Sequence, residues 1–295
     1  MLSFVNRWRS KWLKAIAVIK IMRVINCVMI GLAVIIGEFF ALRDWPGISE
    51  IILGFLTGFF LQAAADVIND YFDREIDAIN NPDRPIPRGD ITPREAILLF
   101  IIFTLIGLTS SLPLGLECFV FASLFWALSF TYNAKLKATG LPGNIIVSMC
   151  VAAPFLFGGL VSTKSFPSIL LIFSLLAFLA NTGREVNKGI VDIEGDKTKN
   201  IKTVAIAFGP KTAAWIAAIF YLSAVILSPL PYILDLLGLS YLILVVSITD
   251  MLFIIFTISL LRDYSPRNAK KIKNLVLIAM LTALIIFIIS PFLGF

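Results

Sequence analysis

Residues 49–77 read SEIILGFLTGFFLQAAADVINDYFDREID, an apolar run that passes without a break into a row of carboxylates. The first part, residues 49–72, is long enough to cross the hydrocarbon core of a bilayer as a helix. If the helix continues, one of its faces carries four aspartates at helical spacing: Asp66, Asp70, Asp73 and Asp77. Aligned like charges repel one another, so this face predicts a bound cation at the end of a membrane span.

The composition of the whole chain is that of a membrane protein. Of its 295 residues, 59% are apolar and 15% are charged, whereas about a quarter of the residues of a soluble domain are charged. The apolar runs lack the alternation of membrane barrels, so we expect an all-α, polytopic membrane protein with a single domain over residues 1–295. Nine spans are predicted, near residues 16–37, 49–72, 94–112, 115–132, 144–162, 167–187, 211–230, 238–261 and 273–291.

The basic residues predict how these spans are oriented. If the spans alternate and the N-terminus is cytoplasmic, 23 of the 25 Lys and Arg residues face the cytoplasm, and only Arg43 and Lys164 lie outside. Positive charge favours the cytoplasmic side, so we expect a multi-pass protein of the cell membrane with its site on that side. Residues 1–14 contain Trp8 and Trp12 among basic residues and are expected to lie on the membrane surface. Basic loops facing anionic lipid explain the net charge of +6 without a nucleic-acid partner.

The chain contains no histidine and three cysteines. Catalytic triads that need histidine are therefore excluded, as are histidine-ligated zinc and haem. A bound metal is expected to be a hard cation with oxygen ligands. The cysteines lie inside apolar runs without metal-ligand spacing, so we interpret them as small buried residues.

A second acidic group follows the sixth predicted span. Glu185 and Asp192 are seven residues apart and share a helical face, Asp196 follows four residues later, and Lys188 lies one turn before Asp192. Alternating spans place this group on the same membrane side as the first. Two facing carboxylate groups suit Mg²⁺ bridged by a diphosphate, because Mg²⁺ combines few carboxylates with substrate phosphates. Taken alone, the second group could equally be a charged loop.

Basic and aromatic residues near both groups are candidates for substrate binding. Positively charged side chains would bind the remaining phosphate oxygens: Arg23, Arg84, Arg88, Lys135, Lys188 and Lys202. The excess of positive charge on the cytoplasmic side explains most of them as well. Tyr132, at the end of the fourth span, is either a site residue or an interfacial anchor. A substrate for such a site has a diphosphate head and an oily tail that lies in an apolar groove.

Several of these stretches resemble the UbiA superfamily of intramembrane prenyltransferases. Asn69-Asp70-x-x-Asp73-x-x-x-Asp77, followed by Arg84-Pro-Ile-Pro-Arg88-Gly, is similar to the superfamily signature. Asp192-Ile-Glu-Gly-Asp196 resembles its second aspartate motif. Arg23-x-x-Asn26 resembles a further motif, with Val24 in place of the usual proline, and Tyr132, Lys135 and Gly143-Asn144 also match. The resemblance covers residues 18–290.

The resemblance implies nine helices around a central cavity and Mg²⁺-dependent prenyl transfer from a polyprenyl diphosphate. It implies that the metal and the diphosphate are held by Asn69, Asp70, Asp73, Asp77, Asp192 and Asp196. The five aspartates of this set and Tyr132 are the expected catalytic residues. The expected substrate-binding residues are Arg23, Asn26, Asn69, Arg84, Arg88, Lys135, Glu185, Lys188 and Lys202. No obligatory protein partner is expected, only substrates and membrane lipid.

The acceptor is indicated by Arg184-Glu185-Val-x-Lys188, which resembles the archaeal digeranylgeranylglyceryl phosphate synthases, although Gly189 stands where an acidic residue is expected. This implies transfer from geranylgeranyl diphosphate to the hydroxyl of geranylgeranylglyceryl phosphate, the second ether bond of archaeal lipid. Lys188 would hold the acceptor phosphate. The base is left open between Glu185, Asp66 and the diphosphate.

The two alternative functions are aromatic prenyl transfer and cation transport. An aromatic prenyltransferase of quinone biosynthesis would use the same metal site with a phenolic acceptor. A cation transporter is disfavoured because transporters bind near the midplane in repeated halves, whereas these carboxylates lie at helix ends on one side.

Overall fold

The computed structural model describes residues 2–198 and 201–293, with the backbone alone for residues 2–11. The long helices are α1 (Leu2–Met22), α2 (Val24–Leu42), α3 (Ile48–Asn80), α4 (Pro93–Ser111), α5 (Leu116–Ala134), α6 (Leu141–Thr163), α7 (Ser168–Val191), α10 (Pro210–Leu227), α13 (Met251–Arg262) and α14 (Pro266–Ile289). Shorter helical segments connect or extend them: η1 (Leu112–Leu114), η2 (Leu136–Thr139), α8 (Ile193–Thr198), α9 (Val204–Phe208), α11 (Leu230–Ile233), α12 (Leu239–Leu244), the π-helix η3 (Val245–Asp250) and η4 (Ser290–Phe292). The described chain contains no strand, which confirms the all-α prediction.

Eight helical segments of the described chain are long and apolar enough to cross a membrane. They begin at Val24, Ile48, Pro93, Leu141, Ser168, Pro210, Leu239 and Pro266. The ninth predicted span, residues 115–132, corresponds to α5, which has 19 residues and ends in the polar run Thr131-Tyr132-Asn133. The protein is therefore a multi-pass membrane protein whose helices agree with the nine predicted spans.

The first predicted span, residues 16–37, begins too early. The structure breaks the helix at Arg23, which has the left-handed dihedrals φ 50° and ψ 59°, and the membrane span starts at Val24. Helix α1 extends to Met22, well past the surface segment expected over residues 1–14. Nothing between residues 14 and 22 breaks a helix, so the sequence pattern did not reveal where α1 ends.

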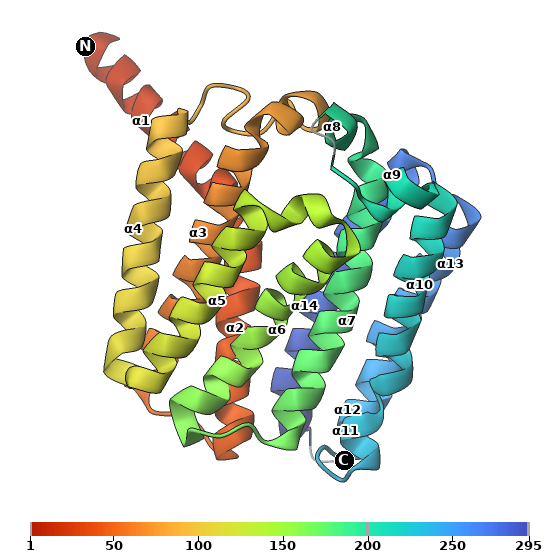
Figure 1. Ribbon diagram of the computed structural model, residues 1–295. Helices are drawn as coiled ribbons and strands as arrows, with labels where there is room; N and C mark the ends of the chain where they lie inside the picture. Colours follow the sequence, from red (N-terminus) through yellow and green to blue (C-terminus); the bar gives the residue numbers. More distant parts are fainter. Residues whose placement is uncertain (1, 199–200, 294–295) are drawn as a thin grey trace.

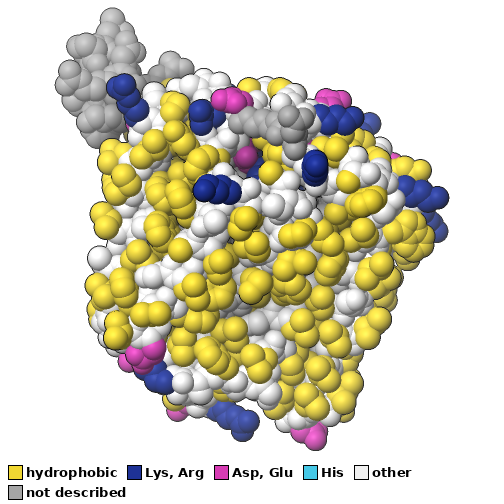
Figure 2. Space-filling view, viewed as in Figure 1, with side chains coloured by type: hydrophobic (Ala, Val, Ile, Leu, Met, Phe, Trp, Pro, Cys, Tyr) yellow, Lys and Arg dark blue, Asp and Glu magenta, His cyan; other side chains and the backbone are white. Residues whose placement is uncertain are grey.

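Consecutive spans run up and down, so the polar connections gather at one end of the bundle (Figure 1). The N-terminus and α8 lie at this end, and the C-terminus lies at the other. Most dark blue and magenta side chains of the visible face lie near the same end, and yellow side chains cover the middle (Figure 2). This arrangement agrees with spans that alternate in direction.

Local sequence features explain how two of the helices begin and pack. Helix α4 starts at a capping box, in which Thr92 accepts from the Glu95 amide and the Glu95 carboxylate accepts from the Thr92 amide. Helices α2 and α6 pack backbone against backbone at two glycines. A Cβ on Gly37 would lie 2.3 Å from the Phe155 carbonyl oxygen, and one on Gly158 would lie 2.2 Å from that of Val34. Only glycine allows this approach, as in other tightly packed membrane helices.

Candidate active site

The acidic face of α3 is buried. Part of it is paired with Arg23, which lies at the break between α1 and α2. Arg23 donates from Nη1 to Asp66 Oδ1 at 2.9 Å and from Nη2 to Asn69 Oδ1 at 3.3 Å, and it forms an ion pair with Asp70. The left-handed backbone at Arg23 costs about 1–2 kcal/mol relative to a right-handed helix. The break turns this side chain across α3, where it binds three residues of the predicted site.

The remaining carboxylates of α3 are paired by cations from two connections. Arg84, in the segment after α3, donates to Asp70 at 3.0 Å and forms an ion pair with Asp77. Lys137, in η2 between α5 and α6, forms an ion pair with Asp73. Asp70, Asp73 and Asp77 are 2%, 6% and 4% exposed. Three separate segments therefore neutralise one buried acidic face.

The second acidic group lies at the junction of α7 and α8. Asp192 is the C-terminal cap residue that follows α7, and the Asp196 amide donates to its carbonyl oxygen at 2.9 Å. Asn80, the last residue of α3, joins the two groups: its Nδ2 donates to the Asp192 carbonyl at 3.2 Å, and its Oδ1 accepts from the Gly195 amide at 3.0 Å. A Cβ on Gly195 would lie 2.4 Å from the Asn80 side chain, so glycine permits this contact.

The Asp196 carboxyl is 3% exposed, and its Oδ1 has no hydrogen-bond partner among the described residues. Burial raises the pKa of Asp196 to about 6, although the charge of Lys137 acts in the opposite direction. Because an unpaired buried oxygen is costly, this atom is available for a cation.

A third charged group lies on α7, one to two helical turns before Asp192. Glu185 forms ion pairs with Arg184 at 3.2 Å and with Lys188 at 3.3 Å. Lys273 of α14 lines a cavity with these residues and forms no ion pair or hydrogen bond within the described part of the chain. Tyr132 of α5 is 5% exposed and lines the same cavity. The group therefore presents more positive than negative charge to the cavity.

Residues of the α3 and α7 groups line one polar cavity of about 580 Å³, whereas Asp192 and Asp196 are not among its lining residues. Eight residues singled out from the sequence line it: Arg23, Asn26, Asp66, Asn69, Arg84, Tyr132, Glu185 and Lys188. Asp70, Asp73 and Asp77 are not among its lining residues and form ion pairs with Arg23, Arg84 and Lys137. The central cavity implied by the resemblance is thus present.

Three predicted substrate-binding residues do not reach this cavity. Arg88 pairs with Asp90 at 3.2 Å, and its side chain is half exposed. Lys135 and Lys202 are exposed and have no ion pair among the described residues. The 3-10 turn η2 after Lys135 directs Lys137, two residues later, toward the acidic face instead. Basic residues in loops are common on the cytoplasmic side, so their sequence positions did not distinguish these roles.

Sequence reasoning missed three residues that the structure brings to the site: Lys137, Asn80 and Lys273. Asn80 could have been found, because it continues the helical spacing of the acidic face, three residues after Asp77. Lys137 and Lys273 carry no such signal. Their importance depends on how the connection after α5 and the helix α14 pack against the rest.

The donor set fits a hard divalent cation. No three acidic or cysteine side chains of the described chain converge as a ready-made metal group, because basic side chains engage the α3 carboxylates. The available donors are nonetheless carboxylate and amide oxygens, which Mg²⁺ prefers. The unpaired Asp196 oxygen provides one ligand position.

The fold and the site together define a polytopic α-helical membrane protein with a buried acidic and basic site at one end. The chain belongs to the UbiA prenyltransferase family, whose model matches residues 30–291. It is a prenyltransferase, as the relatives below are.

Among curated proteins, the digeranylgeranylglyceryl phosphate synthase of Archaeoglobus fulgidus is 36% identical over 96% of this chain and 97% of its own. That of Pyrococcus furiosus is 39% identical over 92% of this chain and 95% of its own. A solved structure described for digeranylgeranylglyceryl phosphate synthase in membranes is 35% identical, with a TM-score of 0.72 over 94% of this chain and 98% of that one.

A structure of a UbiA homologue from Archaeoglobus fulgidus, bound to GPP and Mg²⁺, has a TM-score of 0.65. It is 17% identical and covers 92% of this chain and 99% of its own, so it supports the fold alone.

Proposed function

We propose that this enzyme transfers a geranylgeranyl group from its diphosphate to the free hydroxyl of geranylgeranylglyceryl phosphate. The observation that carries the proposal is that one cavity is lined both by Asp66 and Asn69 of the α3 acidic face and by the cations Arg184, Lys188 and Lys273. A diphosphate with its metal fits the first, and a phosphate monoester fits the second. The names of the relatives, at 36–39% identity over nearly the whole chain, support this acceptor.

Mg²⁺ would be held by Asn69, Asp70, Asp73 and Asp77 of α3 together with Asp192 and Asp196. When bound, it supplies positive charge that stabilises the diphosphate as a leaving group. The protein's own cations contribute as well. Arg23 and Arg84 line the cavity beside the acidic face, where their guanidinium groups are placed to bind the remaining phosphate oxygens.

The chemical step breaks the allylic C–O bond, and its electron pair leaves with the diphosphate. The acceptor hydroxyl oxygen then bonds to the allylic carbon, forming the ether and releasing the hydroxyl proton. Glu185 lies in the cavity between two cations, Asp66 lies beside Arg23, and the departing diphosphate is itself basic. Each is a candidate to accept the proton. The surrounding apolar spans exclude water, which would otherwise capture the carbocation.

The site is proposed to face the cytoplasm. The polar connections lie at the same end as the N-terminus (Figure 1), and the uneven distribution of Lys and Arg in the sequence favours that side as the inner one. A cysteine accessibility assay in intact cells, with single cysteines in place of Lys202 and Lys164, tests this orientation.

A transfer assay on the purified protein tests the reaction, with labelled geranylgeranyl diphosphate and Mg²⁺. Geranylgeranylglyceryl phosphate and 4-hydroxybenzoate are supplied separately as acceptors. We expect product with geranylgeranylglyceryl phosphate and none with 4-hydroxybenzoate. Product with the phenol alone would instead identify an aromatic prenyltransferase of quinone biosynthesis.

The metal site is tested by Asp70→Ala and Asp196→Ala. Each variant is expected to lose turnover while remaining folded in the membrane, as judged by its thermal unfolding in detergent. Activity equal to that of the unmodified protein in either variant would contradict the two-group site.

A further inference from the structure

Two apolar cavities adjoin the polar cavity and share wall residues with it. We call the first the α14 branch; it has a volume of about 90 Å³ and shares Met29, Val151 and Met280 with the polar cavity. The second, the α5 branch, has about 80 Å³ and shares Gln62 and other residues with it. Ile30 of α2 lines all three cavities and marks the fork.

The contact between α2 and α6 separates the two branches beyond this fork. Val34 lines the α5 branch, and Phe155 lines the α14 branch. Each of these residues presents its carbonyl oxygen to a glycine of the opposite helix, so the two backbones touch there. A hydrocarbon chain that has entered one branch therefore cannot cross into the other.

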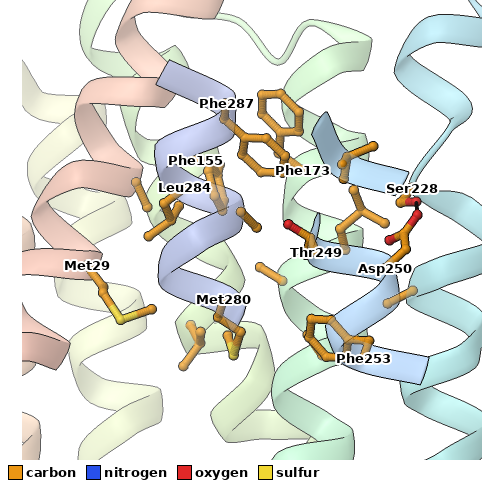
Figure 3. A pocket seen from close by; sticks show the side chains of 18 of the residues that line it. Met29, Phe155, Phe173, Ser228, Thr249, Asp250, Phe253, Met280, Leu284 and Phe287 are labelled. Atoms are coloured by element: carbon orange, nitrogen blue, oxygen red, sulfur yellow. Dashed lines mark hydrogen bonds between the residues drawn. The ribbon is translucent and has the colours of Figure 1, made fainter. Parts of the chain in front are cut away.

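The α14 branch has one end at the polar cavity and the other among aromatic rings. Figure 3 shows Met29 and Met280 toward one end and the rings of Phe173 and Phe287 toward the other. These two rings stack with centroids 4.1 Å apart and nearly parallel planes. The branch thus extends from residues shared with the polar cavity to a cluster of aromatic rings.

The two branches leave the polar cavity beside different charged groups. The α5 branch begins at Gln62 and Ala65 of α3, one turn before Asp66 and Asn69. The α14 branch begins beside Met280, two turns after Lys273 on the same helix. Ala180, on the wall of this branch, is one turn before Arg184 on α7. An acidic group thus lies at the head of one branch, and cations lie at the head of the other.

We propose that the two branches hold two prenyl tails at the same time, the donor tail in the α5 branch and the acceptor tail in the α14 branch, with Lys273 binding the acceptor phosphate. This inference rests on the proposed function, because only an acceptor with its own tail requires a second branch. Lys273 lines the polar cavity with no ion-pair partner among the described residues, so its ammonium group is free to pair with an incoming phosphate.

Tail recognition in this protein depends on shape. A prenyl tail enters from lipid, so it gains little from leaving water, and packing decides how well it fits. Filling one branch should therefore exclude long tails from that branch and leave short tails unaffected. Comparing substrates with long and short tails therefore shows which branch holds the tail of each substrate.

Two matched variants test the assignment: Ala177→Leu fills the α14 branch, and Ala153→Leu fills the α5 branch. Each is assayed with geranylgeranyl and geranyl diphosphates as donors, and with geranylgeranyl and geranyl glyceryl phosphates as acceptors. Ala177→Leu is expected to raise the ratio of KM for the long acceptor to KM for the short acceptor by about tenfold. It should leave the same KM ratio for the long and short donors unchanged. Ala153→Leu is expected to do the reverse.

Equal changes in both ratios, or the opposite assignment, would overturn the inference. If either variant fails to fold, Ala283→Leu replaces the first and Ala122→Leu the second, since these residues line the same branches. Absence of product from the unmodified protein with any glyceryl phosphate acceptor would refute the proposed function. Normal turnover with unaltered tail ratios in both variants would refute only the two branches.

The head-group part is tested by Lys273→Ala, with Lys270→Ala as a matched control. Lys270 is exposed on the same helix and lies outside the cavity. Lys273→Ala should raise KM for geranylgeranylglyceryl phosphate while leaving KM for geranylgeranyl diphosphate unchanged. It should not alter the weaker reaction with geranylgeranylglycerol, which lacks the phosphate. A parallel rise in both substrates' KM would contradict this role.

Discussion

Arg23 has a left-handed backbone conformation at the break between α1 and α2, and its guanidinium group donates a hydrogen bond to Asp66 at 2.9 Å. A strained backbone is retained when the surrounding contacts more than compensate for it. Here the break points the guanidinium at three polar residues of α3, and a straight helix would carry it elsewhere. The strain therefore serves to place a charge in the site.

We expect Arg23→Gly to lower prenyl transfer by about a hundredfold or more, although glycine adopts the left-handed conformation without strain. Removing one partner of a buried ion pair costs about 3–5 kcal/mol, because the other charge remains buried. Arg43→Gly is the control, since Arg43 is also left-handed, with φ 59°, and is exposed at the opposite end of α2. That variant should retain full transfer in the same assay.

The pairing of Lys137 with Asp73 predicts a contrast between two neighbouring lysines. Lys137→Ala should reduce turnover strongly, because it leaves Asp73 buried and removes a charge near Asp196. Lys135→Ala should have a small effect, since that side chain is exposed. The resemblance in sequence favours Lys135, so initial rates of the two variants separate the two assignments.

The Asp196 carboxyl predicts how metal binding depends on pH. Its pKa in the folded protein is raised to about 6 from a usual value of 3.8, so ionisation opposes folding in the metal-free protein. The stability of that protein should therefore fall as pH rises from 3.8 through 6. A cation needs the ionised form, so affinity for Mg²⁺ should weaken when pH is lowered from 7 to 5. Calorimetric titrations with a non-hydrolysable diphosphate analogue measure this, and Asp196→Asn should flatten the dependence.

Asn80 is expected to act as a positioning residue for the second acidic group. Asn80→Ala removes both hydrogen bonds between the end of α3 and the α7–α8 junction. We expect kcat to fall several-fold and the apparent affinity for Mg²⁺ to weaken, while the donor KM at saturating Mg²⁺ changes little. Loss of thermal stability with unchanged metal affinity would indicate a purely structural role.

The glycine contact between α2 and α6 predicts a large effect on stability. Gly158→Ala would place a methyl group 2.2 Å from the Val34 carbonyl oxygen, so the helices must move apart. Overpacking of this kind costs about 1–3 kcal/mol, which should appear as a lower thermal unfolding temperature in detergent. Gly189→Ala is the control, because its nearest neighbour would be 3.4 Å away. Equal unfolding temperatures for the two variants would contradict the contact.

The sequence was sufficient to predict the spans and the acidic face, because both depend on local periodicity. Asp66 to Asp77 lie on one helix, so their spacing alone places them together. The aspartates of the second group were also predicted. The helix break at Arg23 could not be predicted, since neither glycine nor proline marks it.

Contacts between distant segments were the part that could not be predicted. Lys137 reaches Asp73 across 64 residues, and Asn80 reaches Asp192 across 112. Loop lysines are alike in sequence, and only the packing of η2 and α14 separates Lys137 and Lys273 from Lys135 and Lys202. Predicted residues such as Asn69, Tyr132 and Glu185 line the cavity because of their positions on a single helix, whereas Arg84 reaches it from the connection after α3.

The pairing of the acidic face by Arg23, Arg84 and Lys137 has a consequence for the order in which ligands enter. A metal ion arriving alone would take carboxylates away from three cations and leave those cations without partners. A diphosphate arriving alone would attract the cations and leave the carboxylates without theirs. When both bind, the metal ion pairs with the carboxylates that the diphosphate leaves without partners, and the diphosphate pairs with the cations that the metal ion leaves without partners. Metal and diphosphate should therefore tighten each other's binding by the same factor, as thermodynamic linkage requires, and the resting enzyme should bind either one weakly.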